Sequence, residues 1–205
     1  MRIYQPLNKI LNQETKIKII RFLFSTQAEW SGRQIAKEIK VSPATCHKAL
    51  RELYSEKVLL LRSVGVTHLY QLNQENYVVK RILSELFRKE KMVQQDLFRT
   101  IINGIRTKLK EKVISIILFG SMAKMKEKPV SDIDLMVIVN QVNDKREIEK
   151  LIDSINSKII RTFSNRIEPY ILTITELKKR SKLPVIKEIN RTGKLLWGKP
   201  LSELL

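Results

Sequence analysis

Two short apolar runs, separated by a small-residue turn and a pair of acids, constrain this chain more than any other feature. The first run covers residues 113–119 and ends at Gly120-Ser121. The second run opens with Asp132-Ile133-Asp134 and continues as apolar residues. Short runs rich in β-branched residues predict buried strands. We therefore expect two strands, one followed by a turn and the other beginning with two carboxylates.

This arrangement suits a nucleoside triphosphate and a divalent cation. Residues two apart on a strand point to the same face, so Asp132 and Asp134 project together. Adjacent carboxylates repel each other unless a cation lies between them, and hard oxygen ligands suit Mg²⁺ or Mn²⁺. Gly120 lets a phosphate approach the backbone, and the short helix expected after it, through about Lys126, offers free N–H groups. Ser121 and Lys124 add a hydroxyl and a cation, so the sequence predicts a nucleotide and metal site here.

The ordered combination of strand, Gly-Ser, ten residues, Asp-x-Asp and strand resembles the nucleotidyltransferase superfamily, which includes DNA polymerase beta and the small MNT-type proteins. The resemblance covers about residues 95–200. It implies transfer of a nucleotidyl group to an acceptor, with ATP as the expected nucleotide. Asp132 and Asp134 would hold one or two metal ions, and Glu168, on a later strand, would complete the metal site. A salt bridge at a strand edge is the alternative interpretation of Glu168.

Two positions depart from the pattern of many relatives. Met125 stands where a second glycine is common, and Val130, before Ser131, stands where an acid is common. Neither departure removes an expected metal ligand. Both leave open whether the domain transfers nucleotides or binds them without turnover.

The first third of the chain has the element order of a winged helix-turn-helix. Helices are expected over residues 13–25, after Ser31, and from Pro43 to about Glu56. Two β-rich runs around a glycine-containing tip then predict a hairpin. Three helices followed by a hairpin resemble the winged-helix transcriptional regulators, over about residues 10–75.

Residues 42–53 resemble a recognition helix, which such domains place in the major groove with the wing over the DNA backbone. Exposed basic and polar side chains on this helix and the wing can contact phosphates and base edges. The alternative is a winged helix with ordinary solvated residues that serves protein contacts. The residues expected to contact double-stranded DNA are Thr45, His47, Lys48, Arg51, Arg62 and His68.

The net charge of +18 extends over the whole chain. Residues 1–76 carry 12 Lys and Arg against 6 Asp and Glu, residues 77–111 carry 9 against 4, and residues 112–205 carry 18 against 11. A surface this basic attracts phosphate polymers and acidic partners. A proteome rich in lysine would give the same excess, so charge by itself does not identify the partner.

Residues 77–111 contain no proline and predict one long helix, or two helices end to end, between the domains. An apolar stripe on such a helix packs either against a partner subunit, which would give a homodimer, or onto its own domain. The stripe expected from helical spacing consists of Val78, Ile82, Leu86, Val93, Leu97, Ile101 and Ile105.

The expected fold class is α/β (α+β), with a winged helix at 1–76, a helical connector at 77–111 and a nucleotidyltransferase domain at 112–205. No apolar run reaches the length of a membrane span, and the start lacks a signal-peptide core. A single cysteine, Cys46, cannot form an internal disulfide, so we expect a cytoplasmic protein with Cys46 in the core and no zinc site.

Three functions remain open. The chain could be a DNA-binding nucleotidyltransferase that modifies a protein, nucleic acid or small molecule. It could be a transcriptional regulator whose second domain senses nucleotide or has lost activity. It could also be an MNT-type antitoxin that modifies a partner toxin, with the winged helix regulating its own operon.

Overall fold

The computed structural model describes residues 3–109, 111–126, 128 and 131–205, in two compact units, Met1–Met92 and Val93–Leu205. Each unit combines helices with a sheet. The first unit has a three-stranded sheet in the order β1-β3-β2, and the second has a four-stranded sheet in the order β6-β5-β4-β7. The expected α/β (α+β) class is therefore confirmed, while the domain boundaries given above stay predictions.

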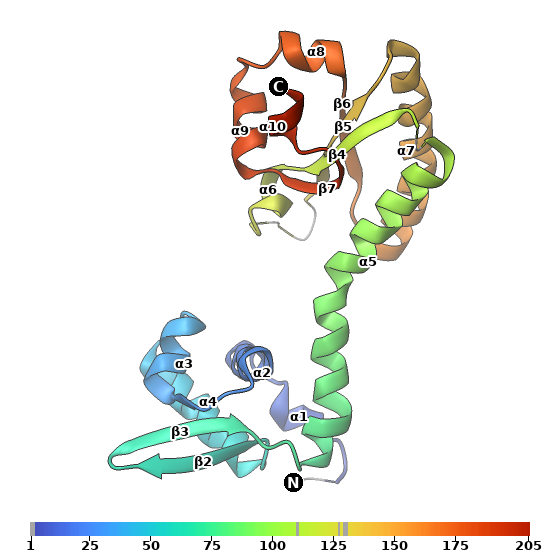
Figure 1. Cartoon of the computed structure of the whole chain (residues 1–205). Coiled ribbons are helices and arrows are strands. Elements are labelled where there is room, and N and C mark those ends of the chain that lie inside the picture. Colours follow the sequence, from blue (N-terminus) through green and yellow to red (C-terminus); the bar gives the residue numbers. More distant parts are fainter. Residues whose placement is uncertain (1–2, 110, 127, 129–130) are drawn as a thin grey trace. The chain divides into compact units, whose positions relative to one another are not determined.

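The first unit is a winged helix-turn-helix, as the element order predicts (Figure 1). Ser31 caps one helix through a capping box with Gln34, and Ser42 accepts a hydrogen bond from the Thr45 N–H at the start of the next. The sequence did not predict the short strand β1, which pairs with β3. The elements are α1 (Leu7–Ile10), α2 (Glu14–Thr26), β1 (Trp30–Ser31), α3 (Gly32–Glu38), α4 (Pro43–Ser55), β2 (Leu59–Val64) and β3 (Thr67–Leu72).

Helix α4 buries one face against the core of this unit. Cys46, Ala49, Leu50 and Leu53 are at most 1% exposed, at the spacing of a helix face. Burial raises the pKa of the Cys46 thiol to about 11, so the group stays a neutral thiol at physiological pH. The expectation that Cys46 is a core residue is confirmed.

Lys16 is a buried cation that ties three helices of this unit together. Its side chain is 2% exposed. The ammonium donates to the Lys9 carbonyl at 2.7 Å and the Asn12 side chain at 3.0 Å, and lies 2.6 Å from the Glu52 carboxylate on α4. A buried ammonium is stable when such partners replace its water. The clamp thereby fixes α4 against α1 and α2.

Replacing Lys16 with methionine is expected to lower the free energy of unfolding of the first unit by about 1–3 kcal/mol, because the acceptors lose their donor. The matched control is Lys18→Met, whose solvent-exposed pair with Glu14 is expected to contribute little to stability. Urea unfolding measures both variants. The hydrogen bond from Lys16 lowers the pKa of Glu52, so this contribution is present above the unfolded pKa of Glu52. This contribution should be lost as the pH falls through the lowered folded-state pKa of Glu52. Equal urea midpoints for the two variants would show that the Lys16 contacts do not stabilise the first unit.

A helical segment follows the wing, and its apolar stripe differs from the expected one. It contains a π-helical stretch, η1 (Val79–Leu83), before α5 (Ser84–Leu109). A π-turn holds an extra residue, which rotates the inward face by about one position. Val79, Leu83 and Phe87 are therefore buried, while Leu86 is 45% exposed. The prediction that Leu86 faces inward is wrong.

The second half of α5 belongs to the core of the second unit. Leu97, Ile101 and Ile105 are at most 5% exposed and pack with the sheet and α7. Val93, at 54% exposed, does not continue this stripe, contrary to the prediction. This half of the stripe packs onto its own unit, so it provides no evidence for a dimer.

The second unit is a mixed sheet with helices on both faces. Strands β5 and β6 are parallel, and β4 is antiparallel to both β5 and β7. The two strands expected around the Gly-Ser and Asp-x-Asp motifs and the later strand with Glu168 are present, whereas β7 and α10 were not predicted and α6 ends before Lys126. The elements are β4 (Val113–Leu118), α6 (Gly120–Ala123), β5 (Ile133–Val139), α7 (Val142–Phe163), β6 (Ile167–Thr173), α8 (Ile174–Lys179), α9 (Pro184–Thr192), β7 (Lys194–Gly198) and α10 (Leu201–Leu204).

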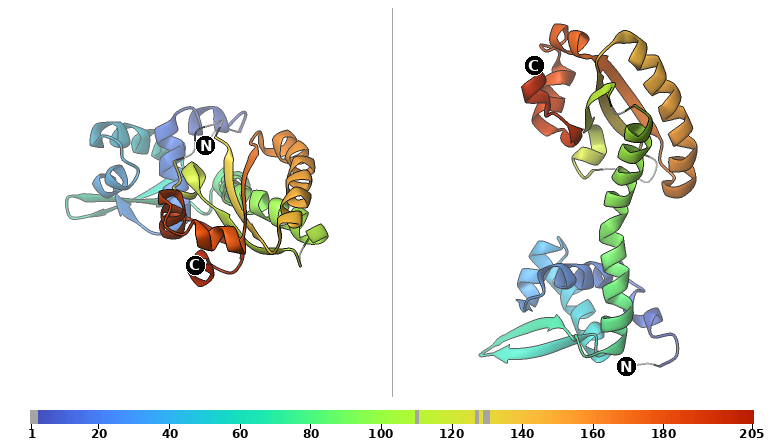
Figure 2. Two further views of the ribbon diagram at one scale, coloured as in Figure 1. Left: turned by 90° about the horizontal axis from the view of Figure 1, so that it is seen from above. Right: turned by 45° about the vertical axis from the view of Figure 1, so that its right-hand side comes forward.

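Alternate residues of β5 serve two separate cores. Ile133, Leu135 and Val137 pack with α5 and α7 on one face. Met136 and Ile138 pack with α8, α9 and α10 on the other, and Figures 1 and 2 show these helices on the two sides of the sheet. Because residues two apart share a face, Asp134 belongs to the α9 side.

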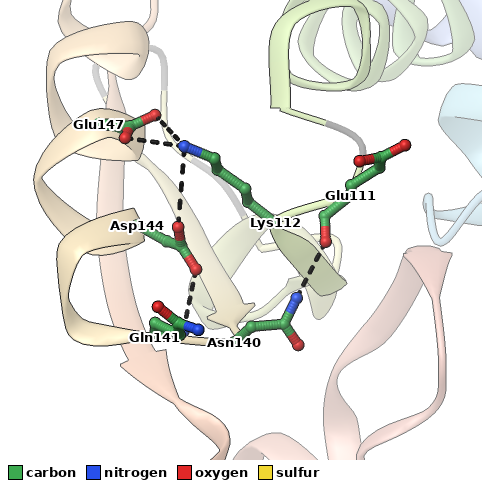
Figure 3. Close-up of polar contacts among 6 residues, drawn as sticks. All are labelled: Glu111, Lys112, Asn140, Gln141, Asp144 and Glu147. Atoms are coloured by element: carbon green, nitrogen blue, oxygen red, sulfur yellow. Dashed lines mark hydrogen bonds and ion pairs between the residues drawn. The ribbon is translucent and has the colours of Figure 1, made fainter.

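A polar cluster fixes the end of the sheet where β4 starts and β5 ends (Figure 3). Lys112 pairs with Glu147 at 2.6 Å and lies 3.9 Å from Asp144, both on α7. The Asn140 side chain donates to the Glu111 carbonyl at 2.9 Å. These contacts lie at the opposite strand ends from Asp134, so they contribute to the scaffold. Within the described ranges, no helix is long and apolar enough to cross a membrane.

Candidate active site

Three carboxylates predicted from the sequence lie at one edge of the second sheet. Asp134 is the second residue of β5 and is directly paired in register with Glu168 on the parallel strand β6. Asp132 comes immediately before β5, two residues from Asp134. Residues paired on neighbouring strands share a face, so Glu168 projects to the same side as Asp134. The fold brings together side chains that are 34 residues apart in the sequence.

Two asparagines hold the strand starts that carry these acids. The buried Asn156 of α7 donates to the Ile167 carbonyl at 3.1 Å and accepts from its N–H at 2.7 Å. Asn165 donates to the Ser131 carbonyl at 2.9 Å. The first pair of bonds fixes the backbone next to Glu168, and the second links the segments that lead into β5 and β6. The carboxylates therefore project from positions that hydrogen bonds define.

Electrostatic repulsion is concentrated on Asp134. Burial raises the pKa of this carboxyl, and the negative charges of Asp132 and Glu168 raise it further. A hydrogen bond from the Ser121 N–H opposes these effects. A half-buried acid beside two others is costly to ionise unless a cation is present. This is the electrostatic situation of a metal ligand.

Gly120 lies against Asp134 so closely that no side chain fits there. A Cβ at this position would be 1.8 Å from Oδ2 of Asp134, and the residue has a φ of +70°. Both the space and the backbone conformation therefore require glycine. The same turn aims the Ser121 N–H at the Asp134 carboxylate. The Gly-Ser turn and the acidic strand thus form one site, as the sequence predicts.

A pocket of about 430 Å³ opens beside this turn, between α6 and α9. Lys124, predicted to bind phosphate, lines it and is ion-paired with Glu188 of α9. This hydrogen bond lowers the pKa of Glu188. A phosphate that entered the pocket would compete with Glu188 for Lys124. The lining residues are Phe119, Gly120, Ser121, Lys124, Lys126, Val185, Glu188, Ile189 and Thr192.

The carboxylate oxygens fit a hard divalent cation whose remaining ligands are supplied by the nucleotide. Within the described ranges, no group of three or more His, Cys, Asp or Glu side chains is placed so that it could hold a metal ion. Mg²⁺ usually binds through one or two carboxylates, with waters and substrate phosphates as further ligands. The pair Asp132 and Asp134, next to the phosphate-sized pocket, matches that requirement. The repulsion on Asp134 is the structural observation that a bound cation would relieve.

Glu168 has no salt bridge among the parts of the chain that the structure describes. Its alternative interpretation as half of an ion pair is therefore not observed, although β6 is an edge strand, as Pro169 indicates. Met125 has a φ of +53°, which explains why glycine is favourable at this position. Val130 lies outside the described residues. The role of Glu168 as a metal ligand stays a prediction.

The residues predicted to contact DNA are exposed on the winged helix. Thr45, His47, Lys48 and Arg51 lie on α4 opposite its buried face, with Thr45 hydrogen-bonded to the cap residue. On the wing, Arg62 pairs with Glu29, which reduces its availability for phosphate. The His68 Nδ1 lies 3.1 Å from the Ser63 hydroxyl, across the hairpin. The structure thus groups four candidates on one helix face and places two on the hairpin.

Sequence reasoning missed the contribution of α9 to the pocket. Glu188 and Thr192 come from this helix, and Phe119 adds an aromatic ring next to the turn. The spacing of the Gly-Ser and Asp-x-Asp motifs contains no information on α9, which comes from a distant part of the chain. The resemblance to the nucleotidyltransferase superfamily over about residues 95–200, a range that includes α9, was the available signal.

A sheet edge with a glycine turn, an Asp-x-Asp pair and a third acid on the neighbouring strand defines a nucleotidyltransferase-type domain. Residues 100–200 match the family model described as "Polymerase beta, Nucleotidyltransferase". This part of the chain is a nucleotidyltransferase domain of the polymerase beta family. No protein in the curated set matches the chain.

Several solved structures are similar to parts of the chain at low identity. A homodimeric winged helix-turn-helix DNA-binding domain from Mycobacterium bovis is 21% identical, with a TM-score of 0.35 over 44% of this chain and 77% of that one. A structure described as a toxin-antitoxin with AMP-PNP is 23% identical, with a TM-score of 0.35 over 52% and 77%. The archaeal chromatin protein TrmBL2 is 16% identical, with a TM-score of 0.29 over 91% and 75%. The domain assignment depends on the family model, not on these likenesses.

Proposed function

We propose that the second unit binds a nucleoside triphosphate with Mg²⁺ or Mn²⁺ and transfers its nucleotidyl group to an acceptor hydroxyl. The observation that carries this proposal is the close approach of Gly120 to Asp134, because it joins the phosphate-sized pocket to the acidic edge. Asp132 and Asp134 would hold the metal together with phosphates of the nucleotide, with Glu168 as the proposed third ligand, and Ser121 and Lys124 would bind the phosphates. The metal would stabilise negative charge on the reacting phosphate and the leaving pyrophosphate.

The chain's own residues divide the remaining work. The Asn156 and Asn165 contacts fix the strand starts, so the acids are preorganised before substrate arrives. Phe119 provides an apolar wall to the pocket, where the nucleotide can exclude water. Lys124 must leave Glu188 to reach a phosphate, which makes Glu188 a competitor of the nucleotide. ATP is the expected nucleotide.

A wild-type experiment tests this function. The protein is incubated with ATP, GTP, CTP or UTP labelled on the α-phosphate, with Mg²⁺ or Mn²⁺ and with RNA, DNA, protein and small-molecule acceptors. Equilibrium binding of each nucleotide is measured in parallel. Metal-dependent binding together with label transfer supports the enzyme. Absence of nucleotide binding under all these conditions contradicts the proposal.

A nucleotide-sensing regulator is the second candidate, and the Lys124–Glu188 pair is the observation that favours it. A lysine held by a glutamate can signal nucleotide binding by changing partners without any turnover. Metal-dependent binding with no transfer to any acceptor would support this alternative.

A protein acceptor such as a partner toxin stays a prediction that the same assay tests. The homodimer and the cytoplasmic location also stay predictions.

We also propose that the winged helix binds double-stranded DNA through α4. Lys48→Ala/Arg51→Ala is expected to weaken duplex binding at least about 10-fold and to reduce the slope of log affinity against log salt by about 2. The control is Lys150→Ala/Lys158→Ala, which removes the same charge from exposed positions on α7. Titration of a labelled duplex at several salt concentrations measures both. Equal slopes of log affinity against log salt in the two variants would contradict the assignment of α4 as the recognition helix.

A further inference from the structure

Another pocket lies in the first unit, between α2, the end of α3 and the start of α5. Its volume is about 550 Å³, within the range of about 300–1,000 Å³ that is typical of small-molecule sites. It shares no lining residue with the pocket beside Gly120. Neither the proposed nucleotidyl transfer nor the proposed DNA contacts of α4 use it, so its lining has to be explained separately.

Apolar side chains form most of the surface of this pocket. Phe22 and Phe24 of α2 are half-buried, as is Ile39, the residue that ends α3. Phe87 of α5 also lines the pocket, and its ring centroid lies 6.1 Å from that of Phe24. Water covers such apolar surface at a cost in free energy, which a ligand would remove by taking the place of the water. The lining therefore favours a ligand with an apolar body.

A bidentate ion pair connects two walls of the pocket. Arg21 of α2 donates two hydrogen bonds to the Glu90 carboxylate on α5, each 2.7 Å long. The Arg21 guanidinium also lies 5.7 Å from the centroid of the Phe87 ring. Bidentate pairs define geometry more closely than single hydrogen bonds do. The two helices are therefore fixed beside the pocket before a ligand arrives, and a preorganised site loses less free energy on binding.

The charges that line the pocket favour a ligand with a single negative charge. Lys18 is paired with Glu14 at 2.6 Å, and Arg21 is occupied by Glu90. Lys91 also lines the pocket and forms no ion pair with any residue that the structure describes. One unoccupied ammonium suits one carboxylate, whereas a triphosphate needs several cations. The charges and the apolar lining together indicate an amphipathic anion.

We propose that this pocket binds a small hydrophobic monocarboxylate. Its apolar body contacts Phe24, Ile39 and Phe87, and its carboxylate pairs with Lys91. The hydrophobic contacts supply most of the affinity, because the pairing with an exposed lysine is weakened by water and salt. The charge supplies selectivity, since a neutral ligand of the same shape loses only the pairing with Lys91. The site belongs to the first unit, so the proposal is independent of nucleotide binding by the second unit.

Calorimetric titration of the full chain with octanoate and 2-naphthoate, each compared with its neutral primary amide, tests the charge selectivity. The wild type is expected to bind the carboxylates about 10-fold more tightly than the amides, and Lys91→Gln should bind both equally. The matched control is Lys89→Gln, which removes an exposed charge from α5 outside the pocket and should keep the wild-type preference. Comparison of the two acids shows whether the pocket prefers an aliphatic or an aromatic body.

Ser25→Phe tests the location of the site, because Ser25 is an exposed residue of the lining and a larger side chain there would occupy the pocket. Binding of acids and amides should weaken at least about 10-fold, whereas Ser157→Phe, at an exposed position on α7, should bind as the wild type does. Urea unfolding checks that both variants fold. Unchanged binding by Ser25→Phe, no preference of the wild type for the acids, or no binding at all would overturn the proposal. A dimer that Ser25→Phe dissociates, without binding of either acid, would show instead that a second copy of the chain covers the pocket.

Discussion

Asp134→Asn is expected to reduce nucleotidyl transfer at least about 100-fold, because an amide is a much weaker ligand for a hard divalent cation. Label transfer at saturating ATP and metal measures this effect. Asp153→Asn, at an exposed position on α7, is the matched control and should retain wild-type activity. Wild-type transfer by Asp134→Asn would contradict the assignment of this residue as a metal ligand.

The same substitution is expected to leave the metal-free protein as stable as the wild type or more so. Burial, Asp132 and Glu168 raise the folded-state pKa of Asp134 above its ordinary value. A raised acid pKa means that the ionised form is disfavoured in the folded state, so the protein gains stability as the pH falls through that value. The neutral asparagine removes this penalty at neutral pH. Thermal melts should therefore show a difference in favour of the variant at pH 7.5 that shrinks at acidic pH.

Lost activity with retained stability separates a site residue from a scaffold residue. A variant that lost activity because it unfolded would melt at a lower temperature throughout. Asp134→Asn that melted well below the wild type in the absence of metal would contradict the repulsion described above. If Asp134 is a metal ligand, added metal should stabilise the wild type more than the variant, because a ligand that binds only the folded state raises stability.

Gly120→Ala is the second substitution with a large expected effect. Its Cβ would meet Oδ2 of Asp134 at 1.8 Å and Cγ at 2.6 Å, so the acid or the turn must move. We expect Mg·ATP binding to weaken at least about 10-fold and transfer to be lost, since a shift of about 1 Å in a site can cost about 100-fold. Equilibrium nucleotide binding and label transfer measure the two effects.

Gly65→Ala provides a control with the same backbone strain and no clash. Gly65 has a φ of +58°, and a Cβ there would have no atom within 4 Å. A left-handed alanine costs about 1–2 kcal/mol, which should appear in the unfolding of the first unit alone. Trp30 and Trp197 report on the two units by fluorescence, in variants that keep one tryptophan each. Unchanged nucleotide binding by Gly120→Ala would show that the approach to Asp134 does not define the site.

The sequence predicted those features of the candidate site that depend on neighbouring residues. The spacing in Asp132-Ile133-Asp134 places the two acids on one face of any strand, whatever surrounds it. Ser31 and Ser42 each cap the helix that follows, because a cap depends on the three residues after it. Where a prediction failed, as for Leu86, a π-turn had shifted the helical register, and periodicity does not contain that information.

Tertiary structure decided what depends on distant parts of the chain. Parallel pairing of β5 with β6 places Glu168 beside Asp134, and the packing of α9 closes the pocket and engages Lys124. These outcomes follow from which buried faces fit each other, a property of the whole core that local patterns do not determine. The sequence by itself therefore determined which residues are proposed to carry the chemistry. The fold decided which of them meet.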